Sequence, residues 1–390
     1  MQSEQKNQHQ DGGGMKKRRE LKLINSGAFG CIFKPSLTCN GEVGSAKYIT
    51  KIQKSERSIT NELRISEKVI NINGYVRFFA PVLKDCNVRF GREHVKDLKK
   101  CEVFEGESTK KIESSSYVSM KTRYVGDKDL KSHLFSILST NSPHKNKLFL
   151  KELWKTHAHL LKGIQKLFAN NIVHFDLKYN NIIFDNTKKS PIIIDFGQSW
   201  AVDELKTEQQ LSTAFFVFDE YDYWCIDILI CNYIFQKVEY EKSKTEMVTQ
   251  EGIDRIYDMF IYGRPDENHA TEKKIQNDAF LYSILLTPKM AGFKSVFYEY
   301  ANAFIGKRTW WELYAELIAN ANTWDHYSLA IIYLNMLDDV FLSNDKLYAE
   351  FASDSRLSKY VELLEGIVYN MPNNRPSVSM AIKEVESFAK

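Results

Sequence analysis

The chain has 390 residues, of which 43% are hydrophobic and 13% aromatic, so it can bury a substantial core. Because single cores stop growing at roughly 250–300 residues, we expect two packed lobes with additional segments. The formal net charge of +3 excludes the strong positive field that is typical of nucleic-acid-binding proteins.

The sequence predicts neither a membrane segment nor a targeting segment. Its apolar runs are shorter than the roughly 18 residues that a membrane-spanning helix needs. The polar N-terminus predicts no signal peptide, and neither end carries a lipidation motif. We therefore expect a soluble, intracellular protein of the cytoplasm.

The cysteines form no recognisable metal or redox motif. None of them makes a C-x-x-C pair, and no Cys/His cluster has the spacing of a zinc site. We expect free thiols in a reducing compartment. The six residues are Cys31, Cys39, Cys86, Cys101, Cys225 and Cys231.

The first twenty residues differ in composition from the rest. They are rich in Gln, Gly and Lys and almost devoid of apolar side chains, which predicts a disordered leader over 1–20. The basic run 16–19 is interpreted as a solvated charge run, with a nuclear-import or nucleic-acid patch as the alternative.

The next hundred residues carry the pattern of a small sheet with one main helix. Two strands are predicted around a glycine turn within 21–33, a third at 48–52 and a helix over 56–70. Residues 76–120 contain strand-like runs, which a charged stretch over 89–111 interrupts. We expect that stretch to be an extended loop, and the run 117–120 to be the last strand of the first lobe.

The remainder of the chain is predicted to be mostly helical. Residues 149–169 carry a broad apolar stripe at helical spacing, and Asn170-Asn171 is a plausible stop. Two short apolar runs follow at 182–184 and 192–194 and are joined by a polar turn. Residues 221–390 are predicted to be helical, and the Trp310-Trp311 pair within them is expected to belong to a core.

Two motifs flank these short apolar runs. The segment Val173-His174-Phe175-Asp176-Leu177-Lys178-Tyr179-Asn180-Asn181-Ile182 follows the long helix, and Ile194-Asp195-Phe196-Gly197 follows the second run. They resemble the H-R-D-L-K-x-x-N catalytic loop and the D-F-G motif of eukaryotic-type serine/threonine protein kinases. The resemblance implies an α+β, bilobal protein kinase fold, with a small antiparallel β-sheet N-lobe and a mostly helical C-lobe.

The resemblance also assigns chemistry to four residues. Phosphoryl transfer depends on positioning and charge neutralisation, and Asp176 would accept the proton of the attacking hydroxyl. Asn181 and Asp195 would hold Mg²⁺ through oxygen atoms, which are the ligands that this ion prefers. Lys178 would stabilise charge on the transferred phosphoryl group of ATP.

A glycine-containing hairpin precedes these motifs and resembles the kinase G-x-G-x-x-G-x-V loop. Gly27 and Gly30 would let backbone N–H groups approach the phosphates of ATP. Asn25 replaces the first glycine and tolerates a positive φ better than most residues do. Ile24 and Ile32 would cover the adenine.

The resemblance further implies a strand lysine and a helix glutamate. The lysine is placed at Lys51, because Tyr48-Ile49-Thr50-Lys51-Ile52 resembles V-A-I-K, with Lys47 as the alternative. Lys51 would hold the α- and β-phosphates. Glu62 is chosen as its partner, and Glu56 and Glu67 are alternatives.

The segment Thr122-Arg123-Tyr124-Val125-Gly126 resembles the kinase hinge, with Thr122 as the gatekeeper. The backbone of Arg123 and of Val125 would meet the adenine. A strand end followed by a turn is an equally good interpretation of the segment by itself.

Two elements near the C-terminus complete the resemblance. Asn374-Arg375-Pro376-Ser377 resembles the R-P-[ST] element, and we expect Arg375 to pair with Glu220. Two segments, beginning at Asp222 and Asp325, compete for the central helix of the large lobe. We choose Asp325, which makes residues 221–320 a large helical insertion.

The chain departs from the family at Phe175, which replaces the arginine that binds an activation-loop phosphate. We therefore hypothesise that activity does not depend on phosphorylation of the activation loop. Lys178 favours serine or threonine over tyrosine as the acceptor. The stretch 215–224, rich in Phe, Tyr and Trp, is similar to kinases of large nucleocytoplasmic DNA viruses, which would place the protein in a host cell or a virion.

We thus expect a monomeric kinase that phosphorylates serine and threonine of protein substrates and requires no nucleic acid. A pseudokinase scaffold and a small-molecule kinase of the aminoglycoside or choline type are the alternatives. The predicted division is a leader at 1–20, an N-lobe at 21–123, C-lobe catalytic and activation segments at 124–220, an insertion at 221–320 and the rest of the C-lobe at 321–390.

Overall fold

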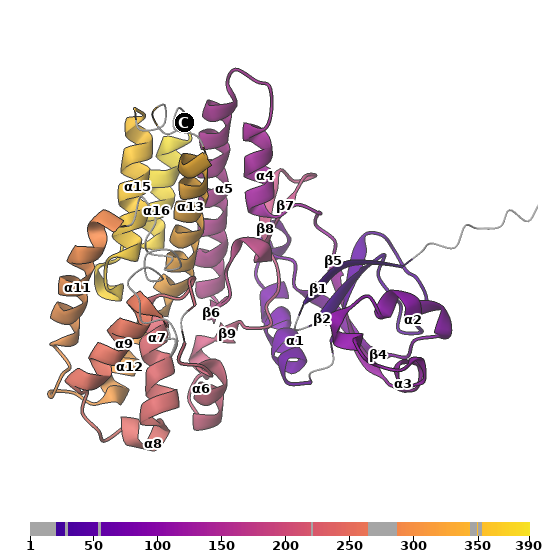
Figure 1. Ribbon diagram of the computed structural model, residues 1–390, viewed down its shortest axis with the longest axis horizontal. Coiled ribbons are helices and arrows are strands. Elements are labelled where there is room, and N and C mark those ends of the chain that lie inside the picture. Colours follow the sequence, from indigo (N-terminus) through magenta and orange to yellow (C-terminus); the bar gives the residue numbers. More distant parts are fainter. Residues whose placement is uncertain are drawn as a thin grey trace, which may run out of the picture. The chain divides into compact units, whose positions relative to one another are not determined.

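The computed structural model describes residues 21–390 apart from 28–29, 54–55, 220, 264–286, 344–348 and 350–352 (Figure 1). The chain divides into two compact units. The sheet unit comprises the chain up to residue 54 together with 84–122. The helical unit comprises 55–83 and 123–390.

A five-stranded sheet, with strand order β1-β2-β3-β5-β4, characterises the sheet unit. β1 pairs antiparallel with β2, and β2 pairs antiparallel with β3. The alternation of buried and half-buried residues along β2 is that of a strand with one face on the core. The strands are β1 (Lys22–Gly27), β2 (Gly30–Lys34), β3 (Tyr48–Gln53), β4 (Val82–Val88) and β5 (Tyr117–Arg123).

The charged stretch 89–111 is not an extended loop, and that prediction is wrong. It forms α2 (Arg92–Leu98) and the short helix η2 (Glu102–Phe104), and α3 (Thr109–Ser114) begins within it. Two of its apolar side chains, Leu98 and Phe104, are almost fully buried in the core of the sheet unit. The stretch has few apolar residues, which suggested a loop, but burying Leu98 and Phe104 stabilises the helices that carry them.

The prediction of free thiols is wrong for four of the six cysteines. Cys31 is bonded to Cys101, with 6.0 Å between their Cα atoms, and Cys39 is bonded to Cys86, with 5.8 Å. These separations are within the usual range for disulfides. Cys225 and Cys231, in the helical unit, are free and buried. The paired residues are 70 and 47 positions apart, so only the fold brings them together.

Helices dominate the other unit (Figure 1). The predicted helices over 56–70 and 149–169 are confirmed as α1 and α5. The helices of this unit are α1 (Glu56–Ile70), α4 (Leu130–Leu138), α5 (Lys145–Phe168), α6 (Glu208–Ala214), α7 (Ile226–Tyr233), α8 (Tyr240–Ser243), α9 (Gln250–Tyr262), α11 (Thr287–Ala301), α12 (Trp310–Ala319), α13 (Trp324–Ser343), α15 (Ser355–Val368) and α16 (Val378–Phe388).

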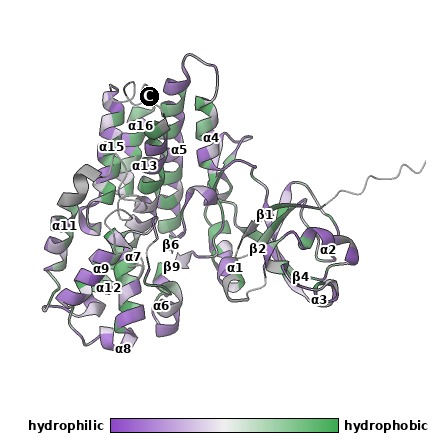
Figure 2. Ribbon diagram, viewed as in Figure 1, coloured by the Kyte–Doolittle hydropathy of each residue, from purple (hydrophilic) through white to green (hydrophobic). Residues whose placement is uncertain are grey.

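The centre of the helical unit is α13. Every residue from Tyr327 to Met336, except Asn335, is buried, so the helix is apolar on all sides, as expected for a helix inside a large core. Figure 2 shows hydrophobic residues along this helix and along α5 and α7. The sequence analysis chose this Asp325 segment as the central helix, but α7, which overlaps the competing Asp222 segment, is also buried throughout, so the choice stays a prediction. Trp310 is buried in the same core, as predicted for the Trp310-Trp311 pair.

A buried ion pair joins α7 to the segment that precedes α16. The guanidinium of Arg375 donates two hydrogen bonds to the carboxylate of Asp227, at 2.6 and 2.9 Å, and both side chains are almost fully buried. Burial opposes the charge of Arg375, but the Asp227 carboxylate more than compensates, so the pKa of the guanidinium is raised. The predicted partner was Glu220, which lies outside the described residues. The described carboxylate partner of Arg375 is Asp227.

Among the described helices, none combines the length and the apolar character that crossing a membrane requires.

Candidate functional site

The segment 174–181 lies between short strands of the helical unit. β6 (Ile172–Val173) pairs with β9 (Trp200–Ala201), and β7 (Ile182–Asp185) pairs with β8 (Ser190–Ile193). The second pair corresponds to the apolar runs predicted at 182–184 and 192–194. The strands therefore bring the two sequence motifs together, because one motif precedes β7 and the other follows β8.

Asp325 fixes the backbone at the start of this segment. Its carboxylate accepts hydrogen bonds from the N–H groups of His174, at 2.7 Å, and Phe175, at 3.0 Å. Phe175 has a φ of 68°, which is uncommon for a residue other than glycine. Strained backbone of this kind persists only where the surroundings enforce it, and the two hydrogen bonds to Asp325 supply that enforcement.

The carboxylate of Asp176 is held by three side chains. Lys178 Nζ lies 3.0 Å from it. The side-chain amide of Asn181 donates to the backbone oxygen of Asp176 at 2.9 Å and to its Oδ2 at 3.0 Å. The hydroxyl of Tyr221 donates to Oδ1 at 2.5 Å. The three predicted residues of this loop are therefore in direct contact.

Tyr221 is a site residue that the sequence analysis missed. Burial, followed by the charge of Asp176, raises the pKa of its phenol, so the hydroxyl stays protonated and can donate. Its ring packs edge-on against Tyr223 and Trp224, with centroids 5.6 and 5.0 Å apart. No local signal separates this tyrosine from its aromatic neighbours, and it lies 45 positions from Asp176.

Asp195 follows β8 and also has a positive φ, of 62°. The residue before it is tied to the 174–181 segment, because Ile194 donates its N–H to the Asn181 backbone oxygen at 3.0 Å. The ring of His174 is in hydrogen-bonding contact with the Ile194 oxygen, also at 3.0 Å. These contacts link the two motifs directly.

Glu62 of α1 lies beside the same segment. A Cβ atom built on Gly197 would be 3.4 Å from Asp195 Oδ1 and 3.5 Å from Glu62 Oε2. Glu62 is 3% exposed. Its neighbour Asn61, which the sequence analysis also missed, donates from its side-chain amide to the backbone oxygens of Gly197 and Ser199, at 3.1 and 2.9 Å. The helix therefore holds residues 197–199 through polar contacts.

Six further residues that are predicted to contact the nucleotide lie in the sheet unit, on its first three strands. Ile24, Asn25 and Gly27 are on β1, Gly30 and Ile32 on β2, and Lys51 on β3. Ile32 is the cross-strand partner of both Asn25 and Lys51.

Gly30 is required sterically in this hairpin. Its φ is 147°, and a Cβ there would lie 2.5 Å from the Ile52 backbone oxygen. A larger residue would therefore clash with β3.

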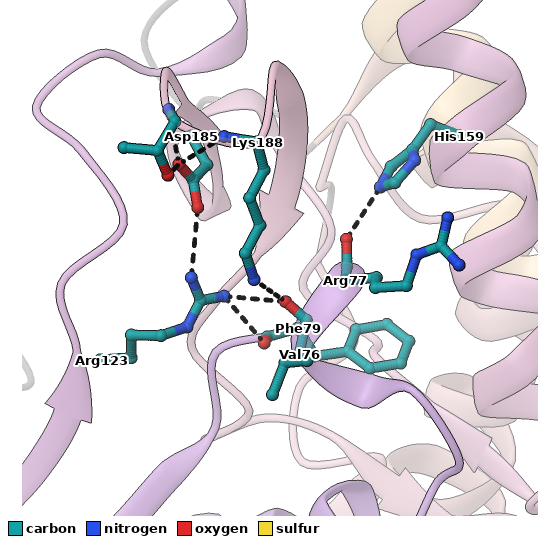
Figure 3. Close-up of polar contacts among 8 residues, drawn as sticks. Val76, Arg77, Phe79, Arg123, His159, Asp185 and Lys188 are labelled. Carbon is teal, nitrogen blue, oxygen red and sulfur yellow. Dashed lines mark hydrogen bonds and ion pairs between the residues drawn. The ribbon is translucent and has the colours of Figure 1, made fainter.

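Arg123 ends β5, and its side chain makes contacts that the sequence did not predict. The guanidinium donates to Asp185 Oδ2 at 3.2 Å and to the Val76 backbone oxygen at 3.1 Å (Figure 3). Burial alone would raise the pKa of Asp185, but hydrogen bonds from Thr187, Lys188 and Arg123 keep it below its usual value. Val125 follows in the connection to α4, and the predicted adenine contact concerns the backbone of both residues.

Asn181 and Asp195 provide a suitable donor set for Mg²⁺. Asn181 uses its amide N–H groups on Asp176, so its side-chain oxygen is the atom that can bind a cation. Asp195 adds a carboxylate immediately after β8. Hard divalent cations favour such oxygen ligands, with waters completing the shell. The residues fit the ion that the sequence resemblance implies.

The family model described as the protein kinase domain matches residues 18–385. No curated protein matches the chain significantly. The match covers the sheet unit, the 174–197 segment and the Arg375–Asp227 pair. The chain therefore belongs to the protein kinase family and has its α+β fold, which supports ATP-dependent phosphoryl transfer as its activity.

Proposed function

We propose that this protein is a serine/threonine protein kinase that transfers the γ-phosphate of ATP with the help of Mg²⁺. The observation that carries the proposal is the environment of Asp176. Its carboxylate is oriented by Lys178, Asn181 and Tyr221, and the Asn181 backbone is bonded to the residue before Asp195. A base and two oxygen ligands for a metal are thus held by one hydrogen-bonded network.

Each residue of the network has a role in the proposed reaction. Asp176 orients the acceptor hydroxyl and takes its proton as the oxygen attacks the γ-phosphorus. Lys178 places a positive charge near the transferred phosphoryl group. The bond between the γ-phosphorus and the bridging oxygen breaks, and ADP leaves. Mg²⁺, held by Asn181 and Asp195, would neutralise charge on the phosphates.

The sheet unit supplies the proposed nucleotide contacts. Gly27 and Gly30 border the hairpin whose backbone N–H groups would face the phosphates, with Asn25 beside them. Lys51 would hold the α- and β-phosphates, and Glu62 would orient it. The remaining proposed contacts are to the adenine, from the side chains of Ile24 and Ile32 and the backbone of Arg123 and Val125.

The preference for serine and threonine rests on Lys178. A lysine two positions after the catalytic aspartate is typical of kinases with these acceptors, and here its Nζ lies 3.0 Å from the Asp176 carboxylate. The expected partners are protein substrates, with the enzyme acting as a monomer in the cytoplasm.

The experiment is a transfer assay with ATP radiolabelled on its γ-phosphate, Mg²⁺ and a mixture of protein substrates. Hydrolysis of the labelled proteins should yield phosphoserine and phosphothreonine, and chelation of Mg²⁺ should abolish labelling. The matched control is Asp176→Asn, which keeps the shape of the side chain but cannot accept the proton. We expect it to reduce the rate by roughly 10²–10⁴-fold.

Three outcomes would contradict the proposal. Phosphotyrosine as the main product would contradict the proposed preference for serine and threonine acceptors. Labelling of sugars or amines alone would indicate a small-molecule kinase. Nucleotide binding without transfer to any acceptor would indicate a pseudokinase scaffold.

A further inference from the structure

A groove lies on the helical unit between α5, the loop before β4, the β7–β8 turn and the end of α16. Its volume is about 790 Å³. None of the residues proposed to bind ATP, Mg²⁺ or the acceptor hydroxyl lines it. The proposed kinase activity therefore leaves this groove without a role.

The rim of the groove is strongly basic. It carries six cationic side chains and one acidic side chain, Glu386, which already pairs with Lys162. Lys155 has a partner outside the groove, Glu152. The remaining cations of the rim are Arg77, Lys188, Lys189 and Lys390.

The side chains of Arg77 and Lys189 lack a counter-charge among the described residues. Arg77 and Lys189 are exposed, and neither makes an ion pair within the part of the chain that the structure describes. The positive charge of the rim also helps to lower the pKa of the neighbouring His159. Burial, followed by the charges of Arg77, Lys162 and Lys155, lowers the pKa of His159 to about 4. The groove therefore has uncompensated positive charge.

The wall of the groove is held in place before any ligand binds. His159 of α5 is in hydrogen-bonding contact with the Arg77 backbone oxygen at 3.1 Å, and its ring stacks on Phe78. Lys188 donates to the Val76 backbone oxygen at 2.7 Å. Figure 3 shows these donors converging on residues 76–79 from two sides, with Arg123 beside Lys188. A preformed wall lowers the entropic cost of binding.

The lining beneath the charged rim is apolar. It includes Phe78, Ala158, Pro191 and Ala389. A groove with an apolar lining and a basic rim is complementary to a peptide that alternates acidic and apolar side chains. It is a poor match for nucleic acid, because the Phe78 ring is buried and cannot serve as a stacking platform for bases.

We propose that this groove is a docking site for an acidic peptide segment of a partner protein, with apolar side chains of the segment on the lining. Carboxylates of the segment pair with the side chains of Arg77 and Lys189, which make no ion pair with any described residue. The site is independent of the phosphoryl-transfer residues, so it does not depend on the proposed kinase activity.

The test is fluorescence polarisation with the full-length protein and a labelled dodecapeptide that repeats Glu-Glu-Leu. We expect saturable binding, which weakens at least about tenfold in the Arg77→Glu/Lys189→Glu variant, because two attractive contacts become repulsive. The control is Lys237→Glu/Lys359→Glu, which makes the same charge change at exposed lysines outside the groove and should bind like the wild type. Melting curves check folding, and Lys155→Glu/Lys189→Glu replaces the first variant if it does not fold.

Peptide controls define the chemistry. Repeats of Lys-Lys-Leu and of Glu-Glu-Ser should bind far more weakly, because the first has the wrong charge and the second has no apolar side chain. Equal weakening in the groove and control variants, or absence of binding by the Glu-Glu-Leu peptide, would overturn the proposal. So would tighter binding of an oligothymidylate of the same length, or displacement of the peptide by an equal concentration of inorganic phosphate.

Discussion

At the scale of single residues, Asp176 is the most constrained side chain of the proposed site. Donors from Lys178, Asn181 and Tyr221 converge on its carboxylate. The first two follow from the sequence motif, whereas Tyr221 comes from a segment 45 positions away. A carboxylate in such a network has few accessible orientations, which is how an enzyme places a base in advance of reaction.

Replacement of Tyr221 by phenylalanine tests this positioning role. The variant removes one hydrogen bond to a charged group and keeps the ring packing, so we expect kcat to fall by roughly 10-fold or more. The KM for ATP should change little. Steady-state kinetics measures both constants.

A matched control is Tyr300→Phe, because the buried hydroxyl of Tyr300 has no hydrogen-bond partner among the described residues. Its kinetics should equal those of the wild type. A Tyr221→Phe enzyme as fast as the wild type, or faster, would contradict the positioning role.

At the scale of elements, an aromatic cluster surrounds Phe175. Phe175, almost fully buried, packs against Phe215, Trp224 and Trp324, with ring centroids 5.3–6.1 Å apart. The indole of Trp224 also donates to the Phe175 backbone oxygen at 2.8 Å. Apolar contacts and one hydrogen bond thus attach Phe215 and Trp224 to Phe175.

This cluster predicts that the enzyme does not need phosphorylation of its activation segment. Treatment with a phosphatase, verified by mass spectrometry to remove every phosphate, should leave kcat within about twofold, because no described contact of Phe175 requires a phosphate. A large loss of activity that returns on rephosphorylation would refute the hypothesis.

The elements also show what could be predicted from the sequence. The helix at 56–70 and the strands at 48–52 and 182–184 are encoded by local periodicity. The helices within 89–111 were missed because Leu98 and Phe104 are isolated among charged residues. Contacts such as Asp227 with Arg375, 148 positions apart, depend on the packing of distant helices, and no local pattern distinguishes Asp227 from Glu220.

At the scale of the whole molecule, the motifs predicted the fold class, because resemblance to protein kinases implies the α+β fold of that family. The sequence did not predict the disulfide pairs, the basic groove or the contact of Tyr221 with Asp176. Each of these involves residues that only the folded chain brings together. The roles of the site residues and the limits of the 221–320 insertion stay predictions. Buried histidines add a further property of the folded molecule, a stability that depends on pH.

His159 predicts loss of stability on mild acidification. Its pKa is about 4 in the folded protein, chiefly because of burial, and the ordinary value is 6.5. Between these two pKa values, His159 is protonated in the unfolded chain but neutral in the folded protein. The free energy of unfolding therefore falls as the pH drops from about 6.5 towards 4. Between about pH 7 and about pH 5 the loss from this residue is about 2 kcal/mol.

Denaturant titrations at these two pH values measure the effect in the wild type and in His159→Gln, which cannot titrate. The variant should lose less stability on acidification than the wild type. An identical pH dependence in both proteins would contradict the prediction.

The most direct test of the central claim is calorimetric titration with a non-hydrolysable ATP analogue, with and without Mg²⁺. Asp195 and Asn181 are proposed to hold the ion, whereas Asp176 is proposed to act on the acceptor. Mg²⁺ should therefore strengthen analogue binding by about tenfold or more in the wild type and in Asp176→Asn, and have little effect in Asp195→Ala. The account would be contradicted if the wild type bound the analogue with the same affinity with and without Mg²⁺. It would also be contradicted if Mg²⁺ strengthened binding in Asp195→Ala as much as in the wild type.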